Sequence, residues 1–152
     1  MMGQTERHRH LIDLEQRALG FRMAGNIEEA AKLFSALVEE QPDWEHGIGF
    51  YDLAGCYEDL GKLELAEECY NAALRYEPAN PYFLGGIASF LYLHREPEKA
   101  FAAYLELLRV AKVNKDEKEV ESLITPLKAL GKKMGLSEAA VIERINTVRI
   151  DR

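Results

Sequence analysis

The chain has 152 residues, of which 47% are hydrophobic and 30% are charged, a balance typical of one soluble globular domain with a substantial core. Residues 1–108 carry 19 acidic against 9 basic side chains, so nucleic acid is not an expected partner. The sequence has no apolar run of about eighteen residues, and its start, MMGQTERHRH, is polar, which argues against a membrane span or secretory signal and favours the cytoplasm.

The first ten residues are expected to form a flexible N-terminal segment, since short polar ends often fray. Beyond them, GNIEEAAKLF at residues 25–34 and GKLELAEECY at residues 61–70 share a glycine, an alanine five positions later and an aromatic residue four positions after that. Corresponding residues lie 36 positions apart: Gly25, Ala30, Phe34 and Pro42 against Gly61, Ala66, Tyr70 and Pro78. A repeat of this length predicts stacked structural units.

Residues 47–80 form the clearest copy. Phe50, Leu53, Ala54 and Tyr57 follow the spacing of one helix stripe, Gly61 suits the end of that helix, and a second stripe runs from Leu65 to Leu74. The pattern predicts two antiparallel helices joined at a glycine. The first copy, residues 11–44, ends within PDWEHG at residues 42–47, where two extra residues predict a longer loop with Trp44 packed inside it.

A third copy, residues 81–114, keeps Ala100 and Tyr104 but has Arg95 where the turn glycine is expected. Residues 115–152 are predicted to form C-terminal capping helices in the same domain, because a stack of repeats needs its apolar end covered. Pro126 predicts a kink or a break in the first of these helices, and Ser137 is a candidate N-cap for the second.

This pattern resembles the tetratricopeptide repeat (TPR), a helix-turn-helix of about 34 residues with L-G-x2-Y, A-x3-F and a late proline. The middle copy matches at Leu53, Tyr57, Gly61, Ala66, Tyr70, Ala73, Leu74, Pro78 and Asn80. The resemblance covers residues 11–114. It implies an all-α fold, a right-handed α-solenoid of three TPR-like helix-turn-helix repeats (11–44, 47–80 and 81–114) with C-terminal capping helices.

No pattern in the sequence predicts catalysis. Its four histidines are scattered, its two cysteines lack the spacing of a zinc site, and phosphate-binding and nucleophile motifs are absent. We therefore expect that the protein is not an enzyme and that it binds no cofactor and no metal. An enzymatic alternative would require a metal at an acidic cluster such as Asp52, Glu58 and Asp59.

The family's geometry instead predicts a binding groove, because the first helix of each repeat turns one face toward the hollow of the superhelix. Tyrosines beside a floor of small residues would grip an apolar side chain and the backbone of a peptide. The glycines have an alternative explanation, close packing of neighbouring helices, and the C-terminal helix is an alternative occupant of the hollow. The expected groove residues are Leu19, Met23, Ile48, Tyr51, Asp52, Gly55, Glu58, Asp59, Tyr82, Gly85, Gly86, Ser89 and Tyr92.

One known binding mode of the family, a clamp on the C-terminal carboxylate of heat-shock chaperones, is argued against. It implies basic and amide residues at positions occupied here by Glu15, Leu19, Asp52, Tyr82 and Gly86. The acidic edge formed by Asp52, Glu58 and Asp59 suits a segment with apolar anchors and some positive charge.

We therefore interpret the chain as a protein–protein interaction adaptor that binds an extended or helical peptide segment of a partner protein in its concave groove. Its size and repeat number are similar to those of bacterial secretion chaperones, which implies a chaperone-like role. The alternative is a structural or self-assembly module, in which the groove is buried in a homodimer and no separate peptide binds.

Overall fold

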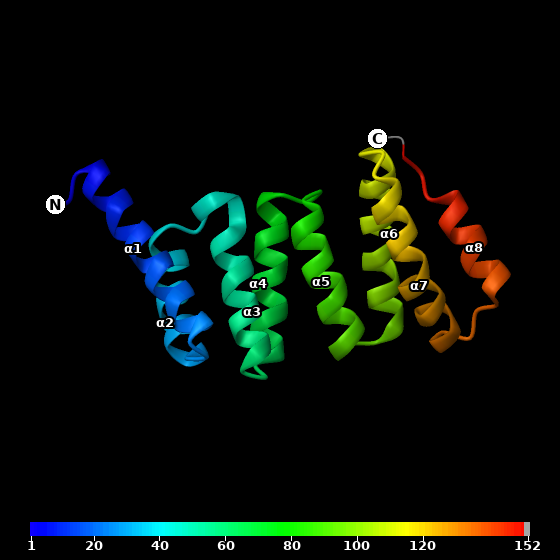
Figure 1. The fold of residues 1–152 in the computed structure, drawn as a ribbon, viewed down its shortest axis with the longest axis horizontal. Coiled ribbons are helices and arrows are strands. Elements are labelled where there is room, and N and C mark those ends of the chain that lie inside the picture. The colour runs from blue at the N-terminus through cyan, green and yellow to red at the C-terminus, as the bar shows by residue number, and fades with distance from the viewer. Residues whose placement is uncertain (151–152) are drawn as a thin grey trace. The chain divides into compact units, whose positions relative to one another are not determined.

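The computed structural model describes residues 1–150 and is all-helical, with eight α-helices, one short 3-10 helix and no strand among those residues (Figure 1). The predicted fold class, an all-helical repeat of helix-turn-helix units, is confirmed. The structure divides into two compact units, Met1–Glu77 and the part that begins at Pro78, which are described separately below. No helix in residues 1–150 combines the length and apolar character needed to cross a membrane.

The first unit contains two helical hairpins. Helix α1 (Gln4–Met23) pairs with α2 (Ile27–Glu40), and α3 (Ile48–Asp59) pairs with α4 (Leu63–Tyr76). Gly25 and Gly61 take φ angles of 83° and 73° at the two turns. Glycine adopts this left-handed conformation without steric cost, which explains why it recurs at the turn of both copies.

A 3-10 turn, η1 (Trp44–Gly47), joins the two hairpins. Glu45 and His46 both have positive φ angles there, 45° and 54°. The Trp44 side chain is 6% exposed, and its indole Nε1 donates a hydrogen bond to Glu15 Oε2 of α1 at 2.7 Å. The expected packing of Trp44 within the longer loop is therefore confirmed.

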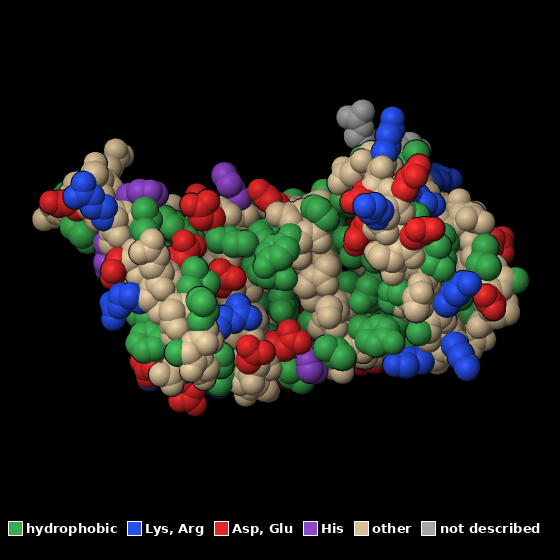
Figure 2. All heavy atoms as spheres, in the orientation of Figure 1, with side chains coloured by type: hydrophobic (Ala, Val, Ile, Leu, Met, Phe, Trp, Pro, Cys, Tyr) green, Lys and Arg blue, Asp and Glu red, His purple; other side chains and the backbone are tan. Residues whose placement is uncertain are grey.

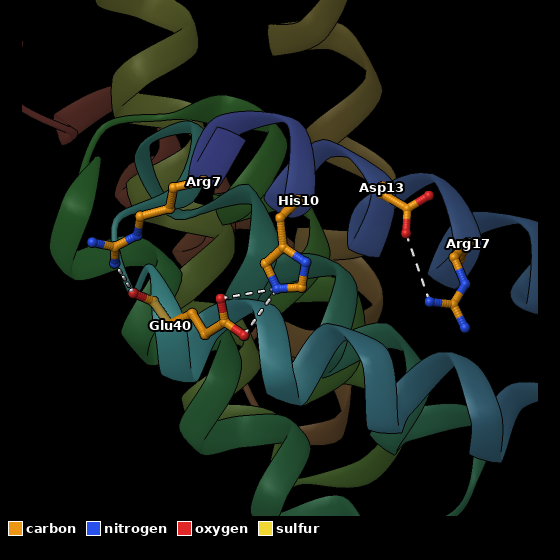
Figure 3. Close-up of polar contacts among 5 residues, drawn as sticks. All are labelled: Arg7, His10, Asp13, Arg17 and Glu40. Atoms are coloured by element: carbon orange, nitrogen blue, oxygen red, sulfur yellow. Dashed lines mark hydrogen bonds and ion pairs between the residues drawn. The ribbon is translucent and has the colours of Figure 1, made fainter. Parts of the chain in front are cut away.

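The N-terminal segment differs from the prediction of a flexible 1–10, because α1 already begins at Gln4. Arg7 Nη2 donates to the Glu40 backbone oxygen at 2.9 Å, and His10 Nε2 lies 3.2 Å from the Glu40 carboxylate (Figure 3). The His8 ring centroid lies 5.6 Å from that of Trp44. These polar residues are ordered by partners about thirty positions away, which a local reading of composition does not detect.

The second unit contains two further hairpins. Helix α5 (Pro81–His94) pairs with α6 (Pro97–Val113), and α7 (Glu117–Lys133) pairs with α8 (Glu138–Thr147). Asn80 caps α5, since its side chain accepts a hydrogen bond from the Tyr82 amide at 2.9 Å. The Ser137 N-cap is confirmed as well, because its Oγ accepts from the Ala140 amide at 3.1 Å.

Helix α7 runs continuously through Pro126, so of the two predicted outcomes, a kink or a break into two shorter helices, the break does not occur. Leu123, Leu127 and Leu130 are buried before and after the proline, and α7 packs along α6. Burial of this stripe offsets the hydrogen bond that Pro126 cannot donate.

Helices α7 and α8 cover α6 and also form a fourth hairpin of the same kind. Gly135 has a φ of 78° and precedes Ala140 by five positions, as Gly25 precedes Ala30 and Gly61 precedes Ala66. Helix α8 contacts α6 as well, because Lys112 Nζ donates to the Ile145 backbone oxygen at 2.6 Å. The predicted cap is thus itself a repeat-like unit.

Small residues occupy the centre of each hairpin. Three pairs of alanines, each pair 12 positions apart, have 0% exposure: Ala18 and Ala30, Ala54 and Ala66, and Ala88 and Ala100. The fourth hairpin has Lys128 at the position of the first alanine. There the close approach is made instead by Gly131, on which an added Cβ would overlap Val141 Cγ2.

This packing predicts opposite effects for two glycine substitutions. Gly131→Ala should lower the free energy of unfolding by about 1–3 kcal/mol, because Val141 is buried and stiff at χ1. Gly20→Ala in α1 should raise it by up to about 1 kcal/mol, because no atom lies within 4 Å of the added methyl group and alanine favours a helix. Urea unfolding followed by circular dichroism measures both. Equal effects would contradict the packing of α8 on α7, and Gly131→Ala/Val141→Ala should lose less stability than the two single changes summed.

Candidate functional site

Every predicted groove residue lies on the first helix of a hairpin, on α1, α3 or α5. Because α1 and α3 belong to the first unit and α5 to the second, two faces are distinguished. The α1–α3 face comprises Leu19, Arg22, Met23, Ile48, Tyr51, Asp52, Gly55, Glu58 and Asp59. The α5–α7 face comprises Tyr82, Gly85, Gly86, Ser89, Tyr92, Leu93 and, from α7, Lys133. Figure 2 shows hydrophobic side chains exposed among charged ones over both units.

Arg22 of α1 is the central charged residue of the α1–α3 face. Its guanidinium covers the backbone of Gly55, where an added Cβ would lie 2.5 Å from Nη2 and 3.1 Å from Cζ. The predicted close approach to Gly55 therefore exists, but the chain's own Arg22 makes it. This position agrees with the alternative explanation of the glycines, contact between neighbouring helices, and corrects the expectation of an open floor.

Two carboxylates flank the Arg22 guanidinium. Its Nη1 lies 3.9 Å from Asp52 Oδ1, and its Nη2 lies 3.9 Å from Asp59 Oδ2. The Asp52 side chain is 15% exposed and that of Asp59 is 51% exposed. Burial raises the pKa of Asp52 to about 6, against the lowering effect of Arg22 and together with a smaller raising effect of Glu15. The positive charge of Arg22 thus partly neutralises the acidic edge predicted from the sequence.

The aromatic part of this face is tied to α4. The Tyr51 and Tyr70 rings meet edge to face with centroids 5.6 Å apart, and Tyr70 Oη donates to Glu58 Oε1 at 2.8 Å. Burial, with the Glu58 hydrogen bond, raises the pKa of Tyr70 above its usual range, which keeps the phenol protonated as donor. Ile48 is half-buried, whereas Leu19 and Met23 of α1 are 38% and 88% exposed.

The α5–α7 face is more open. Tyr82 and Leu93 are 60% and 66% exposed, and Ser89 between them is exposed too. No atom lies within 4 Å of a Cβ added at Gly85, so the backbone of α5 can be approached there. Gly86 is half-buried. This face therefore retains the features expected of the groove, small residues bordered by an aromatic and an aliphatic side chain.

Lys133 adds a charge that the sequence analysis missed. Its Nζ lies 4.9 Å from the Tyr92 ring centroid, and Tyr92 meets the Tyr104 ring of α6 nearly at right angles, 6.2 Å away. The sequence predicts α7 as part of a cap, and that interpretation assigns none of its residues to the groove. The spacing of Gly135 and Ala140 is the signal that could have identified α7 as the first helix of a further hairpin.

Residues 1–150 contain no group of three or more histidine, cysteine, aspartate or glutamate side chains that could hold a metal ion. Cys56 and Cys69 are both buried, and burial raises the pKa of each thiol to about 11. Such thiols are poor nucleophiles at neutral pH because little thiolate is present. What the two faces offer chemically is surface for binding.

Stacked helical hairpins with exposed residues on the first helices define a helical-repeat protein. A family model described as tetratricopeptide repeat matches residues 21–89, which confirms the predicted resemblance to that family over this part of the chain. No curated protein matches the chain by sequence.

A solved structure of the Yersinia enterocolitica type III secretion chaperone SycD, in complex with a peptide of the translocator YopD, is similar to this chain. The TM-score is 0.72 with 22% sequence identity, and the match covers 83% of this chain and 95% of that one. At this identity the similarity shows a shared fold.

The largely buried Asp52 side chain makes stability depend on pH. Its folded-state pKa of about 6 lies above its ordinary value of 3.8, so the folded chain holds the proton more tightly. Its contribution is therefore largest at low pH and is lost as the pH rises through about 6. We expect Asp52→Asn to raise the free energy of unfolding by about 1–3 kcal/mol at pH 8 and to change it little at pH 4.

Asp59→Asn is the matched control, because it removes the same charge from the same helix at an exposed position. It should shift stability by less than about 0.5 kcal/mol at either pH. Urea titrations at pH 4, 6 and 8 provide the comparison. A stability loss in Asp52→Asn at pH 8 would mean that the Arg22 ion pair outweighs the cost of burying the carboxylate.

Proposed function

We propose that the chain is a non-enzymatic protein–protein interaction adaptor that binds an extended or helical segment of a partner protein and has a chaperone-like role in the cytoplasm. The observation that carries this proposal is the exposure of Tyr82 and Leu93 beside the accessible backbone at Gly85. The opposite side of α5 packs in the core, where Phe83, Ile87 and Phe90 are buried.

The energetics favour a segment with apolar anchors. Removing a side chain the size of leucine from water contributes about 1.5–3 kcal/mol to the free energy of binding. One or two apolar anchors packed on Leu93 and Tyr82 therefore supply a substantial share of the roughly 8 kcal/mol that a micromolar Kd requires. An accessible helix backbone at Gly85 lets the main chain of the segment come close. The α1–α3 face of the first unit has exposed apolar residues of its own, Met23 and Leu19.

The structural similarity to SycD supports the proposal, since that chaperone was crystallised with a peptide of the translocator YopD. A fold of this kind can therefore hold a peptide. The choice of peptide depends on the exposed residues, which differ between two chains that are 22% identical.

A homo-oligomer is the alternative, because exposed apolar residues such as Met23 and Leu93 can equally be buried against a second copy. The two functions make different predictions for solution mass. A self-assembly module gains mass as its concentration rises through the micromolar range, whereas an adaptor does so only when its partner is added.

Replacing the exposed residues of the α5–α7 face tests the proposal. We expect Tyr82→Ser/Leu93→Ser to lose at least about tenfold in captured partner from a lysate of the source organism, since two apolar anchors are removed. Val113→Ser/Ile142→Ser is the matched control, because those residues are 47% and 40% exposed elsewhere in the same unit. Quantitative mass spectrometry of captured proteins is the readout, with light scattering on the same samples.

Equal capture by both double variants would place binding elsewhere. Capture of the chain alone, with a mass that rises with concentration in the wild type and falls in Tyr82→Ser/Leu93→Ser, would favour self-assembly instead.

A further inference from the structure

Lys133 stands at the end of α7 with its ammonium over an aromatic ring. Its Nζ lies 4.9 Å from the centroid of Tyr92, and no carboxylate within residues 1–150 lies at ion-pair distance from it. Lys128, one turn earlier, differs, because its Nζ pairs with Glu138 at 2.8 Å. The charge of Lys133 is thus oriented by a ring and not neutralised.

The contact with Tyr92 fixes where this charge is presented. Tyr92 is itself held edge to face by Tyr104 of α6, so the ring is supported from inside the unit. An ammonium group has three N–H donors, and a ring on one side leaves donors for a ligand on the other. The Lys133 side chain is exposed, so these donors can be reached from solvent.

The rest of the α5–α7 face is uncharged, since Tyr82, Gly85, Gly86, Ser89, Tyr92 and Leu93 are all neutral. Lys133 is therefore the charged member of this face. The α1–α3 face has the opposite character, because Asp52 and Asp59 flank Arg22 and Glu58 adds a third carboxylate on the same helix. Charge complementarity makes the two units select differently charged ligand residues.

We infer that the α5–α7 face binds a segment of a partner protein in which an acidic residue lies next to an apolar anchor. The carboxylate pairs with Lys133, and the anchor packs beside Tyr92 and Leu93. This inference rests on the proposed function and refines it. The sequence had suggested a partner with some positive charge, whereas at this face the complementary charge is negative.

A selection of random twelve-residue peptides displayed on phage tests the inference on the full-length chain. The targets are the wild type, Lys133→Glu and Lys132→Glu. Lys132→Glu is the matched control, because it makes the same change of charge at the same helix end, whereas Lys132 lines a cavity with Leu136 and Val141 toward α8. Circular dichroism establishes that all three targets have the same helix content.

We expect wild type and Lys132→Glu to enrich peptides with aspartate or glutamate beside an apolar residue. Lys133→Glu should instead enrich lysine or arginine at that position. A synthetic copy of the best wild-type peptide, measured by fluorescence anisotropy, should bind Lys133→Glu about 5–10-fold more weakly, and its glutamate-to-lysine version should recover binding to that variant.

Two results overturn the inference in different ways. If peptides are enriched with no preference for acidic residues, or if the preference survives in Lys133→Glu, the charge selection is wrong while peptide binding stands. If no target enriches any peptide above the unselected library, the proposed peptide-binding function fails as well.

Discussion

The close approach of two helices at small side chains is the contact on which the rest of the structure depends. In three hairpins a pair of fully buried alanines occupies this position, and in the fourth Gly131 meets Val141. Larger residues there would separate the helices and expose the aromatic and leucine side chains packed around them. These contacts pack one side of the first helix of each hairpin against the second helix. The opposite side of the first helix therefore remains accessible to solvent or a ligand.

Much of this architecture could be predicted from the sequence, because turn glycines, buried alanines and helix stripes are local signals. Gly25 and Gly61 fixed the hairpin turns, and Ser137 the start of α8. What could not be predicted depends on long-range pairing. Glu40 orders the start of α1 from about thirty residues away, and the Arg22 contact with Gly55 spans a similar distance. In the fourth hairpin Lys128 replaces the first alanine, which concealed the repeat there.

The two faces differ in how many of their backbone and side-chain groups are contacted by other residues of the chain. On the α1–α3 face Arg22 covers the backbone of Gly55. Its guanidinium pairs with Asp52 and Asp59. Glu58 accepts a hydrogen bond from the Tyr70 hydroxyl. On the α5–α7 face the backbone at Gly85 is open, and Tyr82 and Leu93 are exposed. The α5–α7 face is therefore the better candidate for binding a partner segment. The polar groups of the α1–α3 face are instead paired with one another. The same residue types, glycine, tyrosine and charged residues, thus pack together in one unit and, in our proposal, take part in recognition in the other.

The central claim is that the α5–α7 face holds a segment of another protein. Site-specific photo-crosslinking in the source organism tests it most directly, with a photoreactive amino acid placed at Ser89 of the face or at Ala102, which is exposed on α6. We expect a crosslink to a distinct partner at position 89 and a much weaker one at position 102. Equal crosslinks at both positions, or a product at position 89 that contains only a second copy of the chain, would contradict it.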